Sequence, residues 1–341
     1  MSTIEKVFIR DLETGQTIIS PFVAKNKQLR AFRDKSGQYL SFQLVDRTGS
    51  IEARVWEEAE AVAALFEDGD AVLVKAVVEE YQGGQQLRVE KIRKAKDDEY
   101  QRLDLVPSTP KDLRELFNEV RANLERVQNP HLQQLLQAFF SDREFVRAFV
   151  GAAGARQIHH AYRGGLLEHV VHCLRLANVV CDNYPELNRD LLLTGVLLHD
   201  IGKIDELDNE LSLELTLVGR FTGHLCLSYQ KVMTRIAALP DFPEDLAMIV
   251  ANMILGHHGR GEFGSPIMPK TVEAEVLHHL ENLDAQAARW LTHIAKERPT
   301  GKAWGEFFDH GLRREVYLKT PEALGLLPSD PPNPPEPAAE G

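Results

Sequence analysis

The chain has 341 residues, of which 43% are hydrophobic and 26% are charged, as is usual for folded globular proteins. This length favours two domains over one, and no apolar run is long enough for a membrane-spanning helix. The net charge of −12 argues against indiscriminate coating of nucleic acid, which depends on Lys and Arg, although residues 1–96 are neutral.

The first hundred residues predict a small β-barrel. Five segments rich in β-forming residues are separated by turn signals; they are 18–24, 38–46, 50–55, 71–79 and 85–92. A short helical stretch, 57–66, follows the third segment. Five strands with a helix between the third and the fourth are typical of an OB-fold, a Greek-key barrel. We therefore expect residues 1–96 to form an OB-fold nucleic-acid-binding domain.

The remainder of the chain predicts helices. Residues 97–110 are charged and contain proline, which is typical of a linker, and either Ser108 or Thr109, ahead of Pro110, suits a helix start. Apolar residues then recur at spacings of three and four, so we expect an all-α domain over 111–320. The Pro-rich stretch 327–341 predicts a disordered tail.

The cysteines bear on the compartment. Cys173, Cys181 and Cys226 lie in apolar surroundings and lack C-x-x-C spacing. Such a sparse, odd-numbered set is typical of reduced thiols in a protein core. The N-terminus also lacks the basic and apolar parts of a secretory signal. We therefore expect a cytoplasmic protein without membrane association.

Histidines and aspartates recur in a particular order in the helical half, at the ends of apolar helical stretches. In chain order they are His169, the pair His199-Asp200, His224, the pair His257-His258, and Asp284. Imidazole and carboxylate groups bind divalent ions such as manganese, iron, cobalt, nickel and zinc. A single histidine in an apolar helix is usually structural, whereas the complete ordered set predicts a metal site.

Asp200 is the residue best placed to serve two ions. A carboxylate beside a histidine can lie between two ions about 3.5–4 Å apart, which would stabilise the attacking and leaving oxygens at phosphorus. Lys203 follows Asp200 by about one helical turn and could reach a substrate phosphate. We expect Asp200 and Lys203 to be the catalytic residues of a phosphohydrolase.

The order of these residues, with LLHDIGK at its centre, resembles the HD superfamily of metal-dependent phosphohydrolases. The segment HHAYRGGLLEHVV at 159–171, with an OB-fold in front of it, resembles the YhaM family of 3′-to-5′ exoribonucleases. The resemblance extends over about residues 5–320. It implies an enzyme that hydrolyses phosphodiester bonds of single-stranded RNA, with DNA as a further candidate substrate, to nucleoside 5′-monophosphates.

The resemblance also implies roles for individual residues. One ion would be held by four side chains: His169, His199, Asp200 and Asp284. Asp200 would bridge to a second ion, held by His224 and by His257 or His258. We favour His257 as the ligand, with His258 in contact with the ion or just behind it. We expect manganese at both positions, although the same ligands accept the other ions named above.

Residues that border the substrate are implied less directly. Lys203 matches a lysine that contacts phosphate, and His160 and Arg163 match a segment beside the substrate. Several other histidines have no place in the pattern, and we expect them to be structural or exposed: His131, His172, His278, His279, His293 and His310. His159 is equally compatible with either role.

The predicted barrel carries basic and aromatic residues in alternation. Lys25, Lys27, Arg30, Phe32 and Tyr39 fall on or beside its first two strands. OB-folds bind single strands through basic grooves and aromatic stacking surfaces, so these residues are candidates for substrate binding. The aromatic residues could equally fill the barrel, and we expect Trp56 to do so.

Two other functions remain open at this point. An HD phosphohydrolase can act on a small nucleotide, such as a cyclic dinucleotide or a nucleoside triphosphate, and a chain of this design could also bind nucleic acid without catalysis. The complete ligand set disfavours the last of these. No sequence feature determines the oligomeric state, so a homo-oligomer is also open.

Overall fold

The computed structural model describes residues 4–32, 36–81, 84–156, 160–208, 213–298, 301–305, 315–319 and 324. The chain divides into two compact units, one that ends at Asp284 and one that begins at Ala285. The Pro-rich stretch 327–341, His159 and His310 lie outside the described residues. None of the helices in the described ranges is both long enough and apolar enough to cross a membrane.

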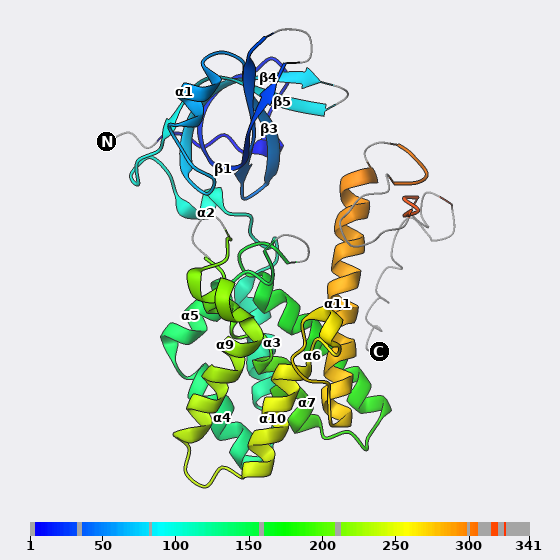
Figure 1. Cartoon of the computed structure of the whole chain (residues 1–341). Coiled ribbons are helices and arrows are strands. Elements are labelled where there is room, and N and C mark those ends of the chain that lie inside the picture. The colour runs from blue at the N-terminus through cyan, green and yellow to red at the C-terminus, as the bar shows by residue number, and fades with distance from the viewer. Residues whose placement is uncertain are drawn as a thin grey trace, which may run out of the picture. The chain divides into compact units, whose positions relative to one another are not determined.

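Five strands close into a barrel in the first unit (Figure 1). They are β1 (Thr17–Ala31), β2 (Gln38–Asp46), β3 (Gly49–Val55), β4 (Ala71–Tyr81) and β5 (Gly84–Lys94). Their order is β1-β2-β3-β5-β4, and only β3 and β5 pair in parallel. Helix α1 (Ala59–Ala63) lies between β3 and β4 in the chain. The OB-fold prediction is therefore confirmed.

The barrel is filled by alternating apolar side chains of the strands, among them Phe22 and Phe42, and by Phe66 from the segment after α1, and all three are almost fully buried. Strand β1 is longer than expected. Its second half pairs with β2 from Gln28↔Ser41 to Ala31↔Gln38, after a register shift between Lys25 and Gln28. The side chains in this half are mostly exposed, so the sequence shows no hydrophobic alternation that would have predicted it as a strand.

The stretch expected as a linker contains structure of its own. A short helix, α2 (Arg102–Leu105), buries Leu105 completely against Val23, Val45 and Ala71 of the barrel. The following helix, α3, does not begin at Ser108 or Thr109. It begins at Leu113, because the Asp112 carboxylate accepts hydrogen bonds from the first free backbone N–H groups.

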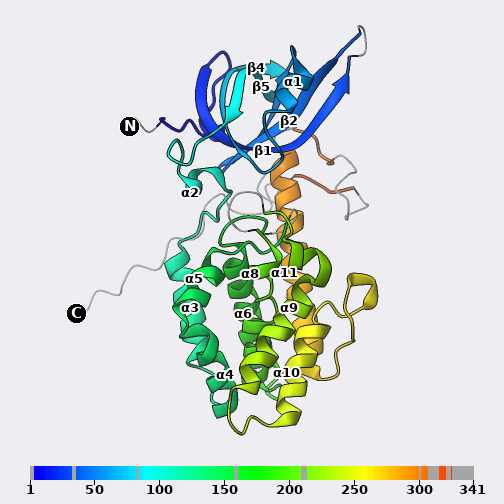
Figure 2. The ribbon, with the colours of Figure 1, turned by 60° about the vertical axis from the view of Figure 1, so that its left-hand side comes forward.

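The helices surround one continuous apolar core. In chain order they are α3 (Leu113–Leu124), α4 (Pro130–Phe140), α5 (Arg143–Gly151), α6 (Gly165–Asn183), α7 (Arg189–Leu198), α8 (Lys203–Glu206), α9 (Leu217–Ala237), α10 (Glu244–Gly256) and α11 (Val272–Glu297). Helix α6 packs against α3, α5 and α7, and α10 packs against α7 and α9 (Figure 2). The all-α expectation for this part is confirmed, and its central helices bring distant histidines together.

Helix α9 contains a break at Gly223, in agreement with the prediction that His224 begins a helix after this glycine. Gly223 has φ 70° and ψ 159°, a conformation that glycine adopts without steric cost. A turn of helix precedes this kink, and His224 begins the longer segment after it. Two residues further on, Cys226 is exposed, so the prediction that all three cysteines are buried in the core is wrong for this one.

Candidate metal centre

Asp200 lies at the end of α7, is 1% exposed, and is surrounded by imidazole nitrogens. Its Oδ2 atom is 3.7 Å from His169 Nε2 and 3.4 Å from His199 Nε2. On the other side, Oδ1 is 3.5 Å from His224 Nε2 and 3.6 Å from His257 Nε2. The two oxygens of one carboxylate thus each face a separate pair of histidines.

His199 and His257 are oriented by the helices that they end. Each is the last residue of its helix turn, where backbone carbonyls lack partners within the helix. His199 Nδ1 lies 2.9 Å from the Val196 carbonyl, and His257 Nδ1 lies 2.7 Å from the Ile254 carbonyl. A carbonyl can only accept, so Nδ1 carries the hydrogen and Nε2 offers its lone pair to Asp200's surroundings.

Three further histidines have the same orientation. His169 Nδ1 meets Asp284 Oδ2 at 2.7 Å, His224 Nδ1 meets Glu206 Oε1 at 3.0 Å, and His258 Nδ1 meets the Phe263 carbonyl at 2.9 Å. In each case Nδ1, the outer nitrogen, contacts an oxygen acceptor. Nε2, the inner nitrogen that faces Asp200 and its neighbours, remains available to an ion. This is the usual arrangement of histidines that bind metals.

The inner atoms form two groups that could each hold an ion. One consists of His169, His199 and Asp200, and the other of His224, His257 and His258. His224 Nε2 and His258 Nε2 are only 3.3 Å apart. The choice between His257 and His258 that the sequence left open is therefore not forced, since both imidazoles face the second group.

Two atoms at the centre lack a hydrogen-bond partner. Asp200 Oδ1 and His257 Nε2 are buried without a hydrogen bond among the described residues. Buried polar atoms without partners are rare, because leaving them unpaired is costly. Nitrogen and oxygen donors of this kind suit divalent transition metals. The residues present therefore fit the ions that the sequence predicts.

Burial keeps several of these imidazoles neutral. It lowers the pKa of His169 to about 4 and that of His258 to about 4, and it lowers the pKa of His257 as well. A neutral imidazole is the form that binds a metal ion. At neutral pH these side chains consequently need not lose a proton before they bind a metal ion.

Lys203 brings a positive charge to the same place. Its ammonium is 2.6 Å from Asp200 Oδ2, and its side chain is 9% exposed. Burial opposes the charge on Lys203, but Asp200 more than compensates and raises the pKa of the lysine. Burial likewise opposes the charge on Asp200, yet Lys203 and His199 bring its pKa well below the usual range. Both groups are therefore charged at neutral pH.

Asp284 is placed differently from the other expected ligands. Its Oδ2 contacts His160 Nε2 at 2.8 Å as well as His169 Nδ1, and its Oδ1 contacts His172 Nδ1 at 2.8 Å. It forms a group with His160 and the outer nitrogen of His169, separate from the group that contains His199 and Asp200. The four residues that the resemblance assigns to one ion therefore fall into two groups, which share His169.

Two residues near Asp284 make contacts that the sequence analysis did not assign to them. His172, expected to lack a role in the pattern, contacts Asp284 directly and is only partly exposed. His160, expected beside the substrate, is 4% exposed and faces Asp284. Arg163 pairs through its backbone with Ser108, from the stretch before α3. The spacing of three residues between His169 and His172 was the available signal, because it places both on one helix face.

The remaining histidines include one that supports the site. His278 Nδ1 is 2.8 Å from the His257 carbonyl, so this side chain braces the turn that carries His257 and His258. His279 is exposed beside Glu275, His131 packs edge-on to Phe242, and His293 is buried near Gly305 in the second unit. These last three agree with the structural or exposed role expected of them.

Two carboxylates of the site were missed by sequence reasoning. Glu206 accepts both the backbone N–H and Nδ1 of His224, and only its position three residues after Lys203 hinted at it. Glu281 precedes Asp284 by about one turn of α11. Burial and the charge of Asp200 raise the pKa of the Glu281 carboxyl to about 7. Glu206 adds negative charge around the positions proposed for ions, and Glu281 adds charge only as its carboxyl ionises.

The Glu281 carboxyl makes a testable contribution to the pH dependence of stability. Its folded pKa is about 7 against 4.5 for an ordinary glutamate, so the folded protein retains a proton that the unfolded chain loses between these values. This stabilisation is present below pH 4.5 and is lost as the pH rises through 7. For metal-free protein, the Tm difference between Glu281→Gln and wild type should become more positive from ~pH 5 to ~pH 8.

The control for this prediction is Glu186→Gln, an exposed position shortly before α7. Its Tm difference from wild type should stay constant over the same pH range. Melting curves followed by circular dichroism measure both. A Glu281→Gln difference that is flat with pH would contradict the assignment of the raised pKa to this carboxyl.

The barrel carries an aromatic cluster on its surface. Tyr39 lies between Phe32 and Trp56, with ring centroids 5.4 Å and 5.0 Å away. The Arg54 guanidinium lies 4.6 Å from the Tyr81 ring and 5.7 Å from the Trp56 ring. All five side chains are half-buried or exposed, so the prediction that Trp56 belongs to the core is wrong. A strand-end position explains this, because Trp56 follows β3 where the barrel wall ends.

The basic residues expected for substrate binding are less uniform. Lys27 is engaged by the barrel itself: its ammonium donates to the Ala63 and Phe66 carbonyls and pairs with Glu67. Lys25 is half-buried, and burial lowers its pKa. Arg30 is exposed and donates to Gln28. Of the three, Lys27 is therefore poorly placed to contact a strand.

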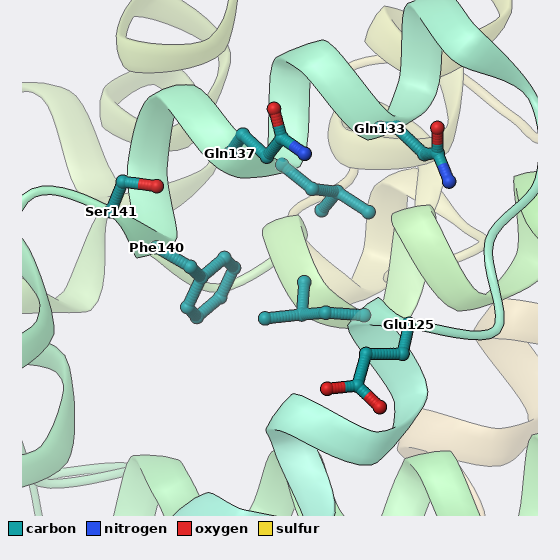
Figure 3. Close-up of a pocket in the computed structure, with 7 residues that line it drawn as sticks. Glu125, Gln133, Gln137, Phe140 and Ser141 are labelled. Carbon is teal, nitrogen blue, oxygen red and sulfur yellow. The ribbon is translucent and has the colours of Figure 1, made fainter.

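A groove of about 400 Å³ lies on α3 and α4, away from the histidine cluster. It is lined by Leu124, Glu125, Gln133, Leu136, Gln137, Phe140 and Ser141 (Figure 3). The groove contains one carboxylate and no imidazole, so it does not bring together several metal-binding groups. The chemistry of the described residues is concentrated around Asp200 instead.

Comparison with known proteins agrees with this arrangement. The family model described as HD domain matches residues 166–286, and the model described as OB-fold nucleic acid binding domain matches residues 25–95. The first match contains all of the histidines around Asp200 and ends just after Asp284. The second covers most of the barrel.

Several named relatives match most of the chain. One, named 3′-5′ exoribonuclease YhaM from Geobacillus sp. (strain WCH70), is 32% identical over 284 residues, which are 82% of this chain and 85% of that protein. The proteins of that name from Listeria welshimeri and Bacillus licheniformis are 32% and 34% identical, over 81% and 73% of this chain and 87% and 78% of theirs.

Proposed function

This chain belongs to the YhaM family of 3′-5′ exoribonucleases, and we propose that it is a metal-dependent phosphodiesterase that shortens RNA from its 3′ end. The observation that carries this proposal is the position of Asp200, whose two oxygens each face a pair of imidazole nitrogens. A carboxylate in that position suits two ions, and two ions suit displacement at phosphorus.

The ligands that we propose follow from the inner atoms. His169, His199 and Asp200 would hold one ion, and Asp200, His224, His257 and His258 would hold the other. When bound, the ions supply an activated water and neutralise charge on the phosphoryl oxygens. We propose manganese at both positions, since the mixed nitrogen and oxygen donors accept it along with other divalent ions.

The side chains around these ligands would do the remaining work. Glu206 and the backbone carbonyls fix the imidazoles of His224, His199 and His257 in one orientation before substrate arrives. Such preorganisation avoids rearrangement during the reaction. The buried Lys203 ammonium would stabilise negative charge that develops on a phosphoryl oxygen, which makes it a candidate catalytic residue beside Asp200.

The barrel would bind the single strand. We propose the cluster of Phe32, Tyr39, Trp56, Tyr81 and Arg54 as the stacking surface, because aromatic rings and an arginine bind unpaired bases without regard to sequence. In this proposal residues 1–96 form the binding domain, 97–110 connect it, and 111–320 form the catalytic domain. Single-stranded DNA would be bound by the same stacking.

The test of this function is incubation of the protein with a 5′-labelled single-stranded RNA and Mn²⁺. We expect a ladder that shortens from the 3′ end, with nucleoside 5′-monophosphates as the released product. A 3′-phosphorylated RNA and a single-stranded DNA of the same sequence test the end and the sugar. An intact RNA, together with hydrolysis of a cyclic dinucleotide or a nucleoside triphosphate, would overturn the exoribonuclease proposal and favour a small-nucleotide phosphohydrolase.

The aromatic cluster leads to a prediction about binding. Tyr39→Ala should weaken the affinity for a single-stranded RNA by about tenfold, because stacking of one base contributes about 1–3 kcal/mol. The rate at saturating RNA should change little, since Tyr39 lies in the barrel and not at the metal centre. Fluorescence anisotropy measures the affinity, and Tyr184→Ala, which removes an exposed tyrosine from the helical part, is the matched control. Equal affinity of Tyr39→Ala and wild type would remove this cluster from the RNA site.

A further inference from the structure

The Glu168 carboxylate in the first turn of α6 gathers three donors from outside that helix. It accepts from Thr109 Oγ1 at 2.5 Å and from the Tyr162 hydroxyl at 3.1 Å, and it pairs with Lys111 Nζ at 2.8 Å. The Glu168 side chain is 7% exposed. Two of these three donors belong to the stretch that precedes α3.

Lys111 makes a second contact that determines a tautomer. Its Nζ lies 2.7 Å from His172 Nε2. An ammonium has only donors, so His172 Nε2 must accept, and the hydrogen of a neutral His172 must be on Nδ1. That Nδ1 lies 2.8 Å from Asp284 Oδ1, in the position to donate to it.

Asp284 connects His172 to His169, a proposed metal ligand. With Oδ1 directed at His172, its Oδ2 receives His169 Nδ1 at 2.7 Å. His169 therefore holds its hydrogen on the outer nitrogen and turns Nε2 toward Asp200, 3.7 Å away. A chain of contacts thus runs from Lys111 through His172 and Asp284 to the inner atom of His169.

The backbone holds Lys111 in place for this contact. Ser108 pairs in parallel with Arg163, the Thr109 N–H donates to the Arg163 carbonyl at 3.0 Å, and the Arg163 N–H donates to the Pro107 carbonyl at 2.7 Å. Lys111 lies outside residues 166–286, which the HD domain model matches. The chain of contacts therefore begins outside the residues that the HD domain model matches.

We propose that Lys111 is a positioning residue of the metal centre, which selects the Nδ1–H form of His172 and thereby sets the orientation of Asp284 and His169. The inference rests on the proposed function only in taking His169 as a metal ligand. An ordinary surface ion pair would contribute little, because solvent screens it. Lys111 is 39% exposed, but its partners are not: Glu168 and His172 are 7% and 26% exposed.

The test compares Lys111→Met, which keeps the length and removes the donor, with Lys111→Arg, which keeps a donor and the charge. Lys270→Met removes an exposed lysine elsewhere in the helical part and is the matched control. Two quantities are measured on the full chain: the tautomer of His172 in metal-free protein, by ¹⁵N-histidine NMR with His172→Gln to assign the signal, and the affinity for Mn²⁺, by calorimetry.

We expect Lys111→Met to shift His172 away from the Nδ1–H form and to weaken Mn²⁺ binding by about tenfold, the lower end of what loss of an outer partner of a metal-binding histidine costs. Lys111→Arg should retain the wild-type tautomer and an affinity within about threefold of wild type. Lys270→Met should match wild type in both measurements.

Each other outcome would overturn the proposal. An unchanged tautomer with weaker Mn²⁺ binding would mean that Lys111 acts only through its charge, and a changed tautomer with unchanged affinity would mean that the chain of contacts does not reach His169. If Lys111→Met fails to fold, Lys111→Arg decides, since loss of the tautomer in a folded Arg variant would refute the selection. Wild-type protein that binds Mn²⁺ but leaves RNA intact would refute the proposed function and leave this inference standing.

Discussion

Asp200→Asn is expected to reduce the rate of RNA shortening by at least about a thousandfold, a loss of roughly 4 kcal/mol of transition-state stabilisation. Asp200 is the only described side chain whose two oxygens face both proposed ion positions, so asparagine affects both at once. Its amide N–H group would also donate to imidazole Nε2 lone pairs that would otherwise bind an ion. Measurement of the initial rate on a 5′-labelled RNA tests this prediction.

Folding must be controlled in this experiment, because Asp200 also balances the charge of Lys203 at 2.6 Å. Breaking a buried pair by removing one partner is usually strongly destabilising. The double variant Asp200→Asn with Lys203→Met removes the unpaired ammonium and should regain much of the lost Tm without regaining activity. Asp205→Asn alters a partly exposed residue of α8 that pairs with Lys231 of α9, and it should retain the wild-type rate.

RNA binding separates this result from the alternative functions. The barrel is untouched in Asp200→Asn, so the affinity for single-stranded RNA should stay within about twofold of wild type. A protein that only binds nucleic acid would have no activity to lose. An active Asp200→Asn variant would refute the proposed metal centre altogether.

Asp284→Asn is expected to weaken Mn²⁺ binding and RNA shortening by about 10–100-fold, a smaller loss than that of Asp200→Asn. Asp284 accepts from three imidazoles and contacts the outer nitrogen of His169. An asparagine has one oxygen, so at least one of these imidazole hydrogens would lose its acceptor. The affinity of His169 for an ion would fall because its orientation is no longer held.

The size of this effect distinguishes two roles for Asp284. If it contacts the ion itself, as the family resemblance implies, Asp284→Asn should match the loss in Asp200→Asn. If it orients His169, some activity should remain and should increase at high Mn²⁺ concentration, because the ligand atoms are still present. Calorimetry and the RNA assay over a range of Mn²⁺ concentrations measure both quantities. Asp182→Asn, an exposed position at the end of α6, is the control.

Some of the structure could be read directly from local pattern. Four of the five strands were predicted close to their observed ends, and the second half was predicted to be helical, because alternation and helical spacing report which face of an element is buried. The second half of β1 was not predicted, because its side chains are mostly exposed and show no alternation of apolar and polar residues. The start of α3 was misplaced because Thr109, which looked like a helix cap, is used by Glu168 instead.

The sequence by itself determined the inventory of the metal centre: an ordered set of histidines and aspartates, each at the end or on one face of an apolar helix. Only the tertiary structure decided how they are used, because an imidazole has two nitrogens and its outer partner selects which one turns inward. For His169 that partner is Asp284, 115 positions away in the chain, and for His172 it is Lys111, 61 positions away. Contacts between residues so distant leave no periodic trace, so the roles of Asp284, His172 and Lys111 emerge only once the helices are packed together.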